Sequence, residues 1–195
     1  MKGKVISFPA PERGAVEPGD DALVASCAAG RAAALGTLFD RHHAMVHRVL
    51  SRLPGADAGD VEDLVQQTFI EVHRSARRFD GRSAVRTWIV SIAINVVRHH
   101  VRSEARRRAL ENAAVQASAA LTPERPDDAE RVHLADRLWK GMAKLSQDRW
   151  AAFVLCDLEG MSGVEAAEAL DVPEGTVWRR LHEARNKLRE TLKEE

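Results

Sequence analysis

A short run of sequence near the C-terminus gives the strongest structural signal: Ser162-Gly163-Val164-Glu165-Ala166-Ala167-Glu168-Ala169-Leu170-Asp171-Val172-Pro173-Glu174-Gly175-Thr176-Val177. Ser162 and Glu165 have the spacing of a capping box, in which each residue satisfies a free backbone amide of the other. Asp171 and Val172 indicate a turn, and Pro173 fits the first position of a second helix, where a missing N–H costs little. A short helix, a tight turn and a longer basic helix are typical of a helix-turn-helix, whose second helix enters the DNA major groove.

The solvent side of this second helix carries side chains suited to nucleic acid. Arginine grips guanine O6 and N7 or phosphate, and the free amides at a helix N-terminus hold a phosphate. The side chains expected there are Thr176, Trp178, Arg179, Arg180, His182 and Arg185. The same spacing also fits a solvated basic face on an ordinary bundle helix, and a tryptophan at this position can instead pack on the preceding helix.

Helical periodicity extends upstream of this motif. Val61, Leu64, Val65, Thr68, Phe69 and Val72 fall at i, i+3, i+4, i+7, i+8 and i+11, with Asp57 or Asp60 as an N-cap. A second helix is expected after the break at Asp80-Gly81, with Ser83 as its cap. A third apolar stripe comprises Val177, Leu181, Ala184, Leu188 and Leu192. No alternating β-branched run competes, so we expect an all-α fold.

The positions of the prolines divide the chain. Pro9, Pro11 and Pro18 predict a flexible tail over residues 1–20. A break at Thr122-Pro123-Glu124-Arg125-Pro126-Asp127-Asp128 predicts a linker that is helical at its start and extended near the prolines. We therefore expect two small helical domains, residues 21–108 and 130–195, joined by a flexible linker over 109–129.

The charge is balanced in total but segregated along the chain. The 195 residues hold 29 basic and 29 acidic side chains. Counted by segment, residues 81–109 carry +6, residues 110–136 carry −4 and residues 176–189 carry +4. Local fields of opposite sign determine partners better than a total of zero does, so the two basic segments are candidate nucleic-acid surfaces.

Several classes of protein are excluded or disfavoured by the sequence. The longest apolar run, Trp150 to Cys156, has seven residues, so no segment is long enough to span a bilayer. No apolar core of a signal peptide follows the basic N-terminus, and Cys27 and Cys156 form no CxxC pair. Walker A, GxGxxG and HExxH patterns are missing from the sequence. We expect a cytoplasmic protein with two free thiols, without a cofactor or a bound metal.

Two stretches in the first domain suggest binding surfaces. Between Arg78 and Trp88, basic side chains alternate with aromatic ones, a pattern that suits single-stranded nucleic acid. Phe79 and Trp88 are equally consistent with a role as core anchors. The preceding helix has an acidic and amide face, which can dock a basic helical partner but can also be a solvated surface. That face comprises Glu62, Asp63, Gln66, Gln67 and Glu71.

These motifs together resemble a known family. Asp63-Leu64-Val65-Gln66-Gln67-Thr68-Phe69, followed by Arg78-Phe79-Asp80-Gly81 and Arg86-Thr87-Trp88-Ile89, is similar to region 2 of an extracytoplasmic-function sigma factor. Leu158-Glu159-Gly160-Met161-Ser162, Glu165 to Leu170, and Val172 to Val177 are similar to its region 4. Two motif blocks in the right order and spacing make this resemblance more specific than a single helix-turn-helix would be.

The resemblance implies a bacterial transcription initiation factor that binds core RNA polymerase, directs it to promoters and helps to melt the −10 element. It implies control by an anti-sigma factor, and no appended sensory domain. The implied polymerase-binding residues are Asp63, Gln66, Gln67 and Glu71. The implied −10 contacts are Phe79, Asp80, Arg82, Ser83, Arg86, Thr87, Trp88, Asn95, Arg98 and Arg102. The implied −35 contacts are Glu174, Gly175, Thr176, Trp178, Arg179, Arg180, His182 and Arg185.

The sequence departs from the family pattern at some of these sites. Ile94 stands where the family often has arginine, and His99 where aspartate is common. Trp178 and Glu183 occupy positions that are often basic, and Gln67 replaces a frequent acidic residue. The −10 helix is therefore less basic than usual.

Two other functions remain as alternatives. A dimeric helix-turn-helix regulator explains residues 162–189 but leaves residues 63–88 without a role. An enzyme would need His42, His43 and His47 to hold a metal, or Cys27 to act as a nucleophile. Asp40 is the one carboxylate beside those histidines at ligand spacing, and no cysteine lies there. Nothing in the sequence lowers the pKa of the Cys27 thiol. We therefore expect no enzymatic activity.

Overall fold

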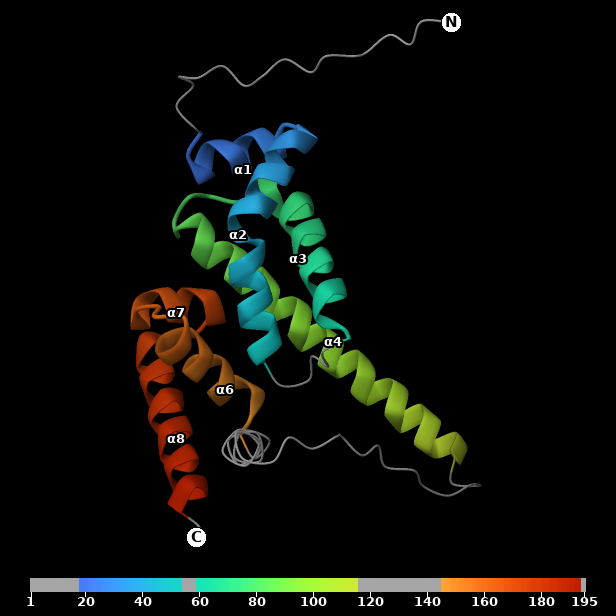
Figure 1. The fold of residues 1–195 in the computed structure, drawn as a ribbon, viewed down its shortest axis with the longest axis vertical. Coiled ribbons are helices and arrows are strands. Elements are labelled where there is room, and N and C mark those ends of the chain that lie inside the picture. The colour runs from blue at the N-terminus through green and yellow to red at the C-terminus, as the bar shows by residue number, and fades with distance from the viewer. Residues whose placement is uncertain (1–17, 54–58, 116–144, 194–195) are drawn as a thin grey trace, which may run out of the picture.

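A computed structural model describes residues 18–53, 59–115 and 145–193, and in these ranges it contains helices and no strands (Figure 1). The expected all-α fold is confirmed. The helices fall into two halves. The first half comprises α1 (Asp20–Ala28), α2 (Ala32–Arg52), α3 (Val61–Ser75), η1 (Ala76–Arg78) and α4 (Val85–Val115). The second comprises α6 (Gln147–Phe153), η2 (Val154–Leu158), α7 (Gly163–Leu170) and α8 (Glu174–Lys193).

In the first half, α2, α3 and α4 pack against one another and α1 covers α2 and η1. The apolar stripe predicted on α3 is confirmed, since its members from Val61 to Val72 are buried. They meet Leu38, Val46 and Val49 of α2 and Ile89, Ala93 and Val97 of α4 in the core. Asp60 is the N-cap residue of α3, as expected, whereas the cap expected at Ser83 is wrong. The alternative cap, Asp57, lies outside the described residues. The Asp60 side chain makes no capping hydrogen bond, and the Ala84 carbonyl, not Ser83, receives the first amide bond of α4, from Trp88.

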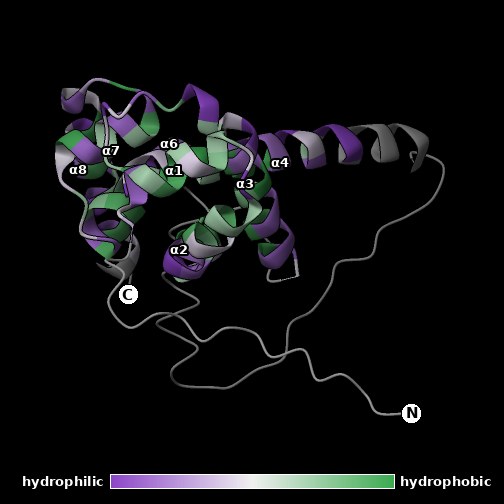
Figure 2. Ribbon diagram, turned by 90° about the horizontal axis from the view of Figure 1, so that it is seen from above, coloured by the Kyte–Doolittle hydropathy of each residue, from purple (hydrophilic) through white to green (hydrophobic). Residues whose placement is uncertain are grey.

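Helix α4 continues well beyond the core of the first half. Up to Arg107, where the described side chains of this helix end, its last buried residue is Val97, whereas the helix itself ends at Val115. Figures 1 and 2 show its C-terminal part leaving the other helices. The helix therefore passes the predicted domain boundary at residue 108, and the start of the predicted linker is helical, as expected.

In the second half, the predicted helix-turn-helix is confirmed, and each of its turn signals has a physical cause. The Ser162 side chain accepts from the Glu165 amide, and the Ser162 amide donates to the Glu165 carboxylate at 2.8 Å. Asp171 ends α7 with φ of 54°, a left-handed conformation that aspartate tolerates. The Pro173 carbonyl accepts from the Thr176 amide at 2.8 Å. Pro173 thus lies just before α8, one residue earlier than predicted.

The two halves are in contact. Helix α7 lies beside the first part of α4, and η2 contacts α2 (Figure 1). Buried apolar side chains of both halves, with the exception of Leu181, belong to one continuous cluster. The sequence predicted the helices of the two halves but left their relative arrangement open. Within the part of the chain that the structure describes, no helix is long and apolar enough to cross a membrane.

Candidate nucleic-acid interface

A groove of about 900 Å³ lies between α3 and α4. One wall is formed by Asp63, Gln67 and Glu71 of α3. The other wall includes Trp88 and Asn95 of α4, with His99 one turn beyond Asn95. Because residues seven and eleven positions apart lie on one face of a helix, Trp88, Asn95 and His99 project into the groove together. Two predicted sites, one for polymerase and one for the −10 strand, therefore share a single groove. Gln66 is exposed and does not line it.

The loop at the start of α4 presents a mixed surface. The rings of Phe79 and Trp88 lie 4.8 Å apart and both pack against the core while remaining partly exposed. Both readings of these aromatics, as core anchors and as contact residues, are therefore compatible with their placement. The Asp80 carboxylate accepts from the Arg82 amide and also pairs with its guanidinium at 3.1 Å. Gly81, with φ of 73°, makes this turn possible, and Arg82 is almost fully exposed.

The remaining predicted −10 residues lie in different environments. Thr87 is buried in the core, so in this conformation it packs and does not face a ligand. Ser83 is partly exposed and Arg102 is exposed. Arg86 and Arg98 project toward the second half of the molecule, where both have protein partners. The predicted set is therefore divided between the groove, the loop, the core and the contact between the halves.

On α8 most predicted residues lie on one free face. Gly175, Trp178, Arg179, His182 and Arg185 are exposed. Glu174 is exposed as well, and its carboxylate accepts from the Trp178 indole N–H at 3.0 Å. The Trp178 ring lies against Gly163, where an added Cβ would come within 2.6 Å of the ring. Trp178 is thus half exposed and also packed on the preceding helix.

Three charged residues of α8, including the exposed Arg185, bind other side chains of the protein. Arg180 binds Asp148 at 2.7 Å, and only 18% of its side chain is exposed. Arg185 makes two hydrogen bonds to Asp157, at 2.9 and 2.5 Å, which raise the pKa of its guanidinium. Glu183 binds Arg149 at 2.6 Å. Thr176 is partly buried.

Comparison with known proteins identifies both halves. Residues 38–107 match the family model "Sigma-70 region 2" and residues 135–188 match "Sigma-70, region 4". The ECF RNA polymerase sigma factor SigM of Mycobacterium tuberculosis is 32% identical over 178 residues, which cover 90% of this chain and 86% of SigM. The chain belongs to the ECF RNA polymerase sigma factors. The ECF RNA polymerase sigma-E factor of Haemophilus influenzae is 30% identical over 85% of this chain and 91% of its own.

Solved structures of similar fold agree with this assignment. CnrH, in complex with the cytosolic domain of CnrY, aligns with a TM-score of 0.60 and 30% identity over 89% of this chain and 96% of CnrH. The sigma factor RpoE of Bartonella quintana, in complex with the anti-sigma factor NepR, aligns with a TM-score of 0.58 and shares the fold at 24% identity, over 82% of this chain and 97% of RpoE. The protein is therefore a transcription initiation factor that directs RNA polymerase to promoters. Below, the first half is called region 2 and the second half region 4.

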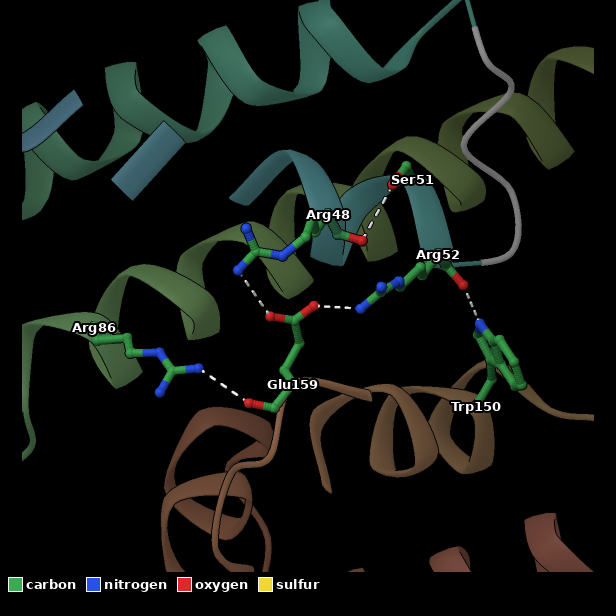
Figure 3. A network of polar contacts seen from close by, with 6 residues as sticks. All are labelled: Arg48, Ser51, Arg52, Arg86, Trp150 and Glu159. Atoms are coloured by element: carbon green, nitrogen blue, oxygen red, sulfur yellow. Dashed lines mark hydrogen bonds and ion pairs between the residues drawn. The ribbon is translucent and has the colours of Figure 1, made fainter. Parts of the chain in front are cut away.

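Sequence reasoning did not identify the residues that join region 2 to region 4 of this sigma factor. Glu159, which follows η2, binds Arg48 at 3.3 Å and Arg52 at 2.5 Å, and its carbonyl accepts from Arg86 at 3.2 Å (Figure 3). The Trp150 indole donates to the Arg52 carbonyl. Asp148 binds Arg98 at 3.0 Å as well as Arg180. These partners lie up to 111 positions apart, so no local pattern could have paired them.

The three histidines considered for a metal site have separate partners. His42 Nε2 lies 2.8 Å from Asp20, His43 stacks on Phe39, and His47 lies 3.4 Å from Glu62. Burial alone would raise the pKa of Asp20, but hydrogen bonds from Arg41 and His42 outweigh it and lower that pKa. Among the described residues, no three metal-ligating side chains gather at one point.

The two cysteines lie in surroundings that disfavour the thiolate. Burial raises the pKa of the Cys27 thiol, whose sulfur lies 3.2 Å from Nδ1 of His73, a histidine that the sequence did not single out. Burial and the neighbouring Asp157 raise the pKa of Cys156. A nucleophilic cysteine requires the opposite shift.

Proposed function

We propose that this sigma factor divides its work between three surfaces: the α3 face for core polymerase, the α3–α4 groove with the 79–84 loop for the −10 strand, and the free face of α8 for the −35 element. The observation that carries the proposal is the groove. There Asp63, Gln67 and Glu71 face Trp88 and Asn95 across one opening. A DNA strand bound by the α4 wall would therefore lie next to polymerase bound by the α3 wall.

For the polymerase surface, the support is exposed charge beside an apolar stripe. Asp63, Gln66 and Gln67 are exposed on α3, and Glu71 is partly exposed. Acidic and amide groups of this kind complement a basic helical partner, and such complementarity sets orientation and association rate more than affinity. Ile70, also exposed on α3, adds apolar area to the same surface.

For the −10 strand, the support is an aromatic pair beside an exposed arginine. Phe79 and Trp88 offer rings on which an extruded base can stack, and Arg82 can follow the backbone. Unstacking a base step is unfavourable by about a few kcal/mol, and holding the base in a protein pocket offsets part of that cost.

For the −35 element, the support is the free face of α8. Arg179 is 68% exposed and bound only loosely, at 3.9 Å, by Glu183. Trp178 and His182 flank it along the same helix. An exposed arginine on a recognition helix can bind guanine through two hydrogen bonds. Two weak DNA sites on one chain bind together when their spacing matches, which would make the promoter selective.

Further parts of the assignment follow from the family. We infer domain boundaries of 21–108 and 130–195 around the 109–129 linker, with the last ordered turns of α4 inside the linker. We infer that the protein acts by binding, without catalysing a reaction, and in the cytoplasm, where core polymerase meets the chromosome. The anti-sigma factor NepR bound to RpoE suggests a partner of that class for this chain.

The test is transcription in vitro with sigma-free core polymerase on fragmented genomic DNA of the host, with mapping of RNA 5′ ends. We expect new start sites that share two spaced upstream elements. Asp63→Lys should reduce affinity for core polymerase about tenfold, because it places a positive charge on an acidic docking face. Asp21→Lys makes the same change at an exposed site on α1 and should leave that affinity unchanged.

A dimeric helix-turn-helix regulator would give a different result. It would shift duplex DNA alone, protect two-fold symmetric sites about one helical turn apart and yield no new start sites. That outcome would overturn the assignment of the α3 face and the groove.

A further inference from the structure

One carboxylate joins the two DNA-binding regions. Asp148 of α6 binds Arg98 of α4 through Oδ1 at 3.0 Å and Arg180 of α8 through Oδ2 at 2.7 Å. Arg98 is a predicted −10 contact and Arg180 a predicted −35 contact, and each side chain is only about a fifth exposed, at 20% and 18%. Each guanidinium gives one N–H to Asp148 and is about four-fifths buried, so little of it is left accessible to a phosphate or a base.

A second carboxylate, Glu159, also binds across the contact between the two regions. The Glu159 side chain is 3% exposed, and it binds the guanidinium groups of Arg48 and Arg52 on α2 (Figure 3). Burying a carboxylate without partners is strongly unfavourable, and the ion pairs with these arginines offset that cost. Gly160, with φ of 67°, turns the chain directly after Glu159.

The backbone beside Glu159 engages a third DNA-contact candidate. Arg86 donates to the Glu159 carbonyl at 3.2 Å. In addition, the Trp150 indole donates to the carbonyl of Arg52, the last residue of α2, where helix carbonyls lack intrahelical partners. The contact between the regions therefore uses specific polar partners as well as apolar area.

From these contacts we propose that the free sigma factor is closed on itself, with Asp148 and Glu159 acting as an intramolecular latch that covers Arg86, Arg98 and Arg180. The proposal rests on the DNA-binding roles inferred above. In the closed form, protein carboxylate and carbonyl oxygens occupy the arginines that nucleic acid would otherwise bind. Trp178, Arg179 and His182 stay exposed, so −35 recognition is only partly masked, whereas −10 binding loses two of its cations.

The latch is expected to be weak enough to open. Arg48 and Arg52 are 51% and 38% exposed and Asp148 is 44% exposed, so solvent and salt screen these ion pairs. A partner that binds only the open form shifts the population toward it. Core polymerase, by engaging both regions, would be such a partner.

The experiment uses the full chain free of polymerase. Asp148→Asn keeps the shape of the side chain and removes the charge that both arginines bind. Glu159→Gln does the same at the second carboxylate, whose partners Arg48 and Arg52 have no assigned DNA role. Asp40→Asn, at an exposed position on α2, is the matched control for the loss of one negative charge. Each protein is measured by small-angle X-ray scattering and by titration with a short mixed-sequence single strand and a short mixed-sequence duplex.

We expect both latch variants to have a larger radius of gyration than the wild type and the Asp40→Asn control. Their affinity for the single strand should rise roughly three- to tenfold, in keeping with ion pairs of modest strength. The slope of log K against log salt should steepen by about one for each phosphate contact regained. Because Asp148 is well exposed, Asp148→Asn is expected to fold even if Glu159→Gln does not.

Either of two results would overturn the latch. One is a wild-type protein that already scatters as an extended molecule. The other is an Asp148→Asn variant that binds the single strand no more tightly than Asp40→Asn does. The transcription assay distinguishes failure of the latch from failure of the proposed function. If the wild type gives new start sites but Asp148→Asn has the same single-strand affinity as the control, the latch alone is rejected. If the wild type gives no start sites, the proposed sigma-factor roles are rejected, whatever the scattering shows.

Discussion

The two helices assigned to DNA present their side chains differently. Helix α8 keeps Trp178, Arg179 and His182 on one free face, whereas Arg180 points inward to Asp148 and Arg185 binds Asp157. Helix α4 directs Trp88 and Asn95 into the groove and turns Arg86 and Arg98 toward region 4. A helix that reads a duplex needs one continuous face, whereas a helix that meets a melted strand between other elements can use several. The comparison indicates that region 4 is largely ready to bind DNA and that region 2 is not.

The largest expected effect concerns whether the two regions are stable independently. Ile89 of α4 and Leu155 of η2 belong to the apolar cluster that both regions share, and both side chains are fully buried, at 0% exposure, in opposite regions. Replacing either by alanine should lower the free energy of unfolding by about 2–5 kcal/mol, through lost burial and the cavity left behind. Because the apolar cluster is continuous, we expect one shared transition in chemical denaturation monitored by circular dichroism. Two separate transitions, each shifted by only one of the variants, would show that the regions unfold independently.

The next effect separates the two neighbouring arginines of α8. Arg179→Ala should weaken binding to a mapped −35 duplex by about 1–3 kcal/mol if a base contact is lost, in the free protein and in holoenzyme alike. Arg180→Ala should have that effect only in holoenzyme, because Asp148 already occupies this guanidinium in the free protein. Fluorescence anisotropy with the same duplex measures both states. Affinity for core polymerase serves as the control and should not change.

A third test concerns the support beneath Trp178. Gly163→Ala places a methyl group within 2.6 Å of the indole ring and within 2.9 Å of Glu174 Oε1. We expect a destabilisation of about 1–2 kcal/mol and an altered exposure of the indole, because overpacking forces a side chain to move. Thermal unfolding and fluorescence quenching by iodide report these effects. Gly175→Ala, with open space around its Cβ, is the matched control, and an equal effect there would contradict the packing argument.

The smallest effect concerns the cap of α7. Hydrogen bonds from Ser162 hold the pKa of Glu165 below its usual value. This stabilisation is therefore present above the unfolded pKa of about 4.3 and is lost as pH falls through the lower folded value. Glu165→Ala should cost about 0.5–1 kcal/mol at neutral pH and less in acid. Unfolding titrations at the two pH values measure the difference, and a pH-independent cost would exclude the carboxylate as its source.

Local pattern predicted much of this molecule. The buried stripe from Val61 to Val72 and the capping box at Ser162 follow from residues close in sequence, and both are confirmed. The assumed cap at Ser83 was wrong because Ala84 occupies the position whose carbonyl begins the helix. Thr87, predicted as a DNA contact, proved to be buried, since a family motif gives residue type but not the direction of each side chain.

The contact between the regions could not be predicted in the same way. Glu159 meets Arg52 across 107 positions, and Asp148 meets Arg98 across 50. Each of these residues, taken alone, looks like an ordinary solvated charge. The packing of α7 on α4 and of η2 on α2 brings these pairs together, and packing depends on the whole surface of the elements involved.

The π-helical turn η2 determines where Glu159 points. In an α-helix each residue advances about 100° around the axis, so one additional residue in a turn rotates everything after it by about that angle. The Glu159 amide bonds to Val154, five residues back, which is the signature of this additional residue. The direction in which Glu159 points therefore depends on the number of residues in this turn as well as on the charges around it. Removing one residue between 154 and 158 would rotate Glu159 away from the arginines of α2.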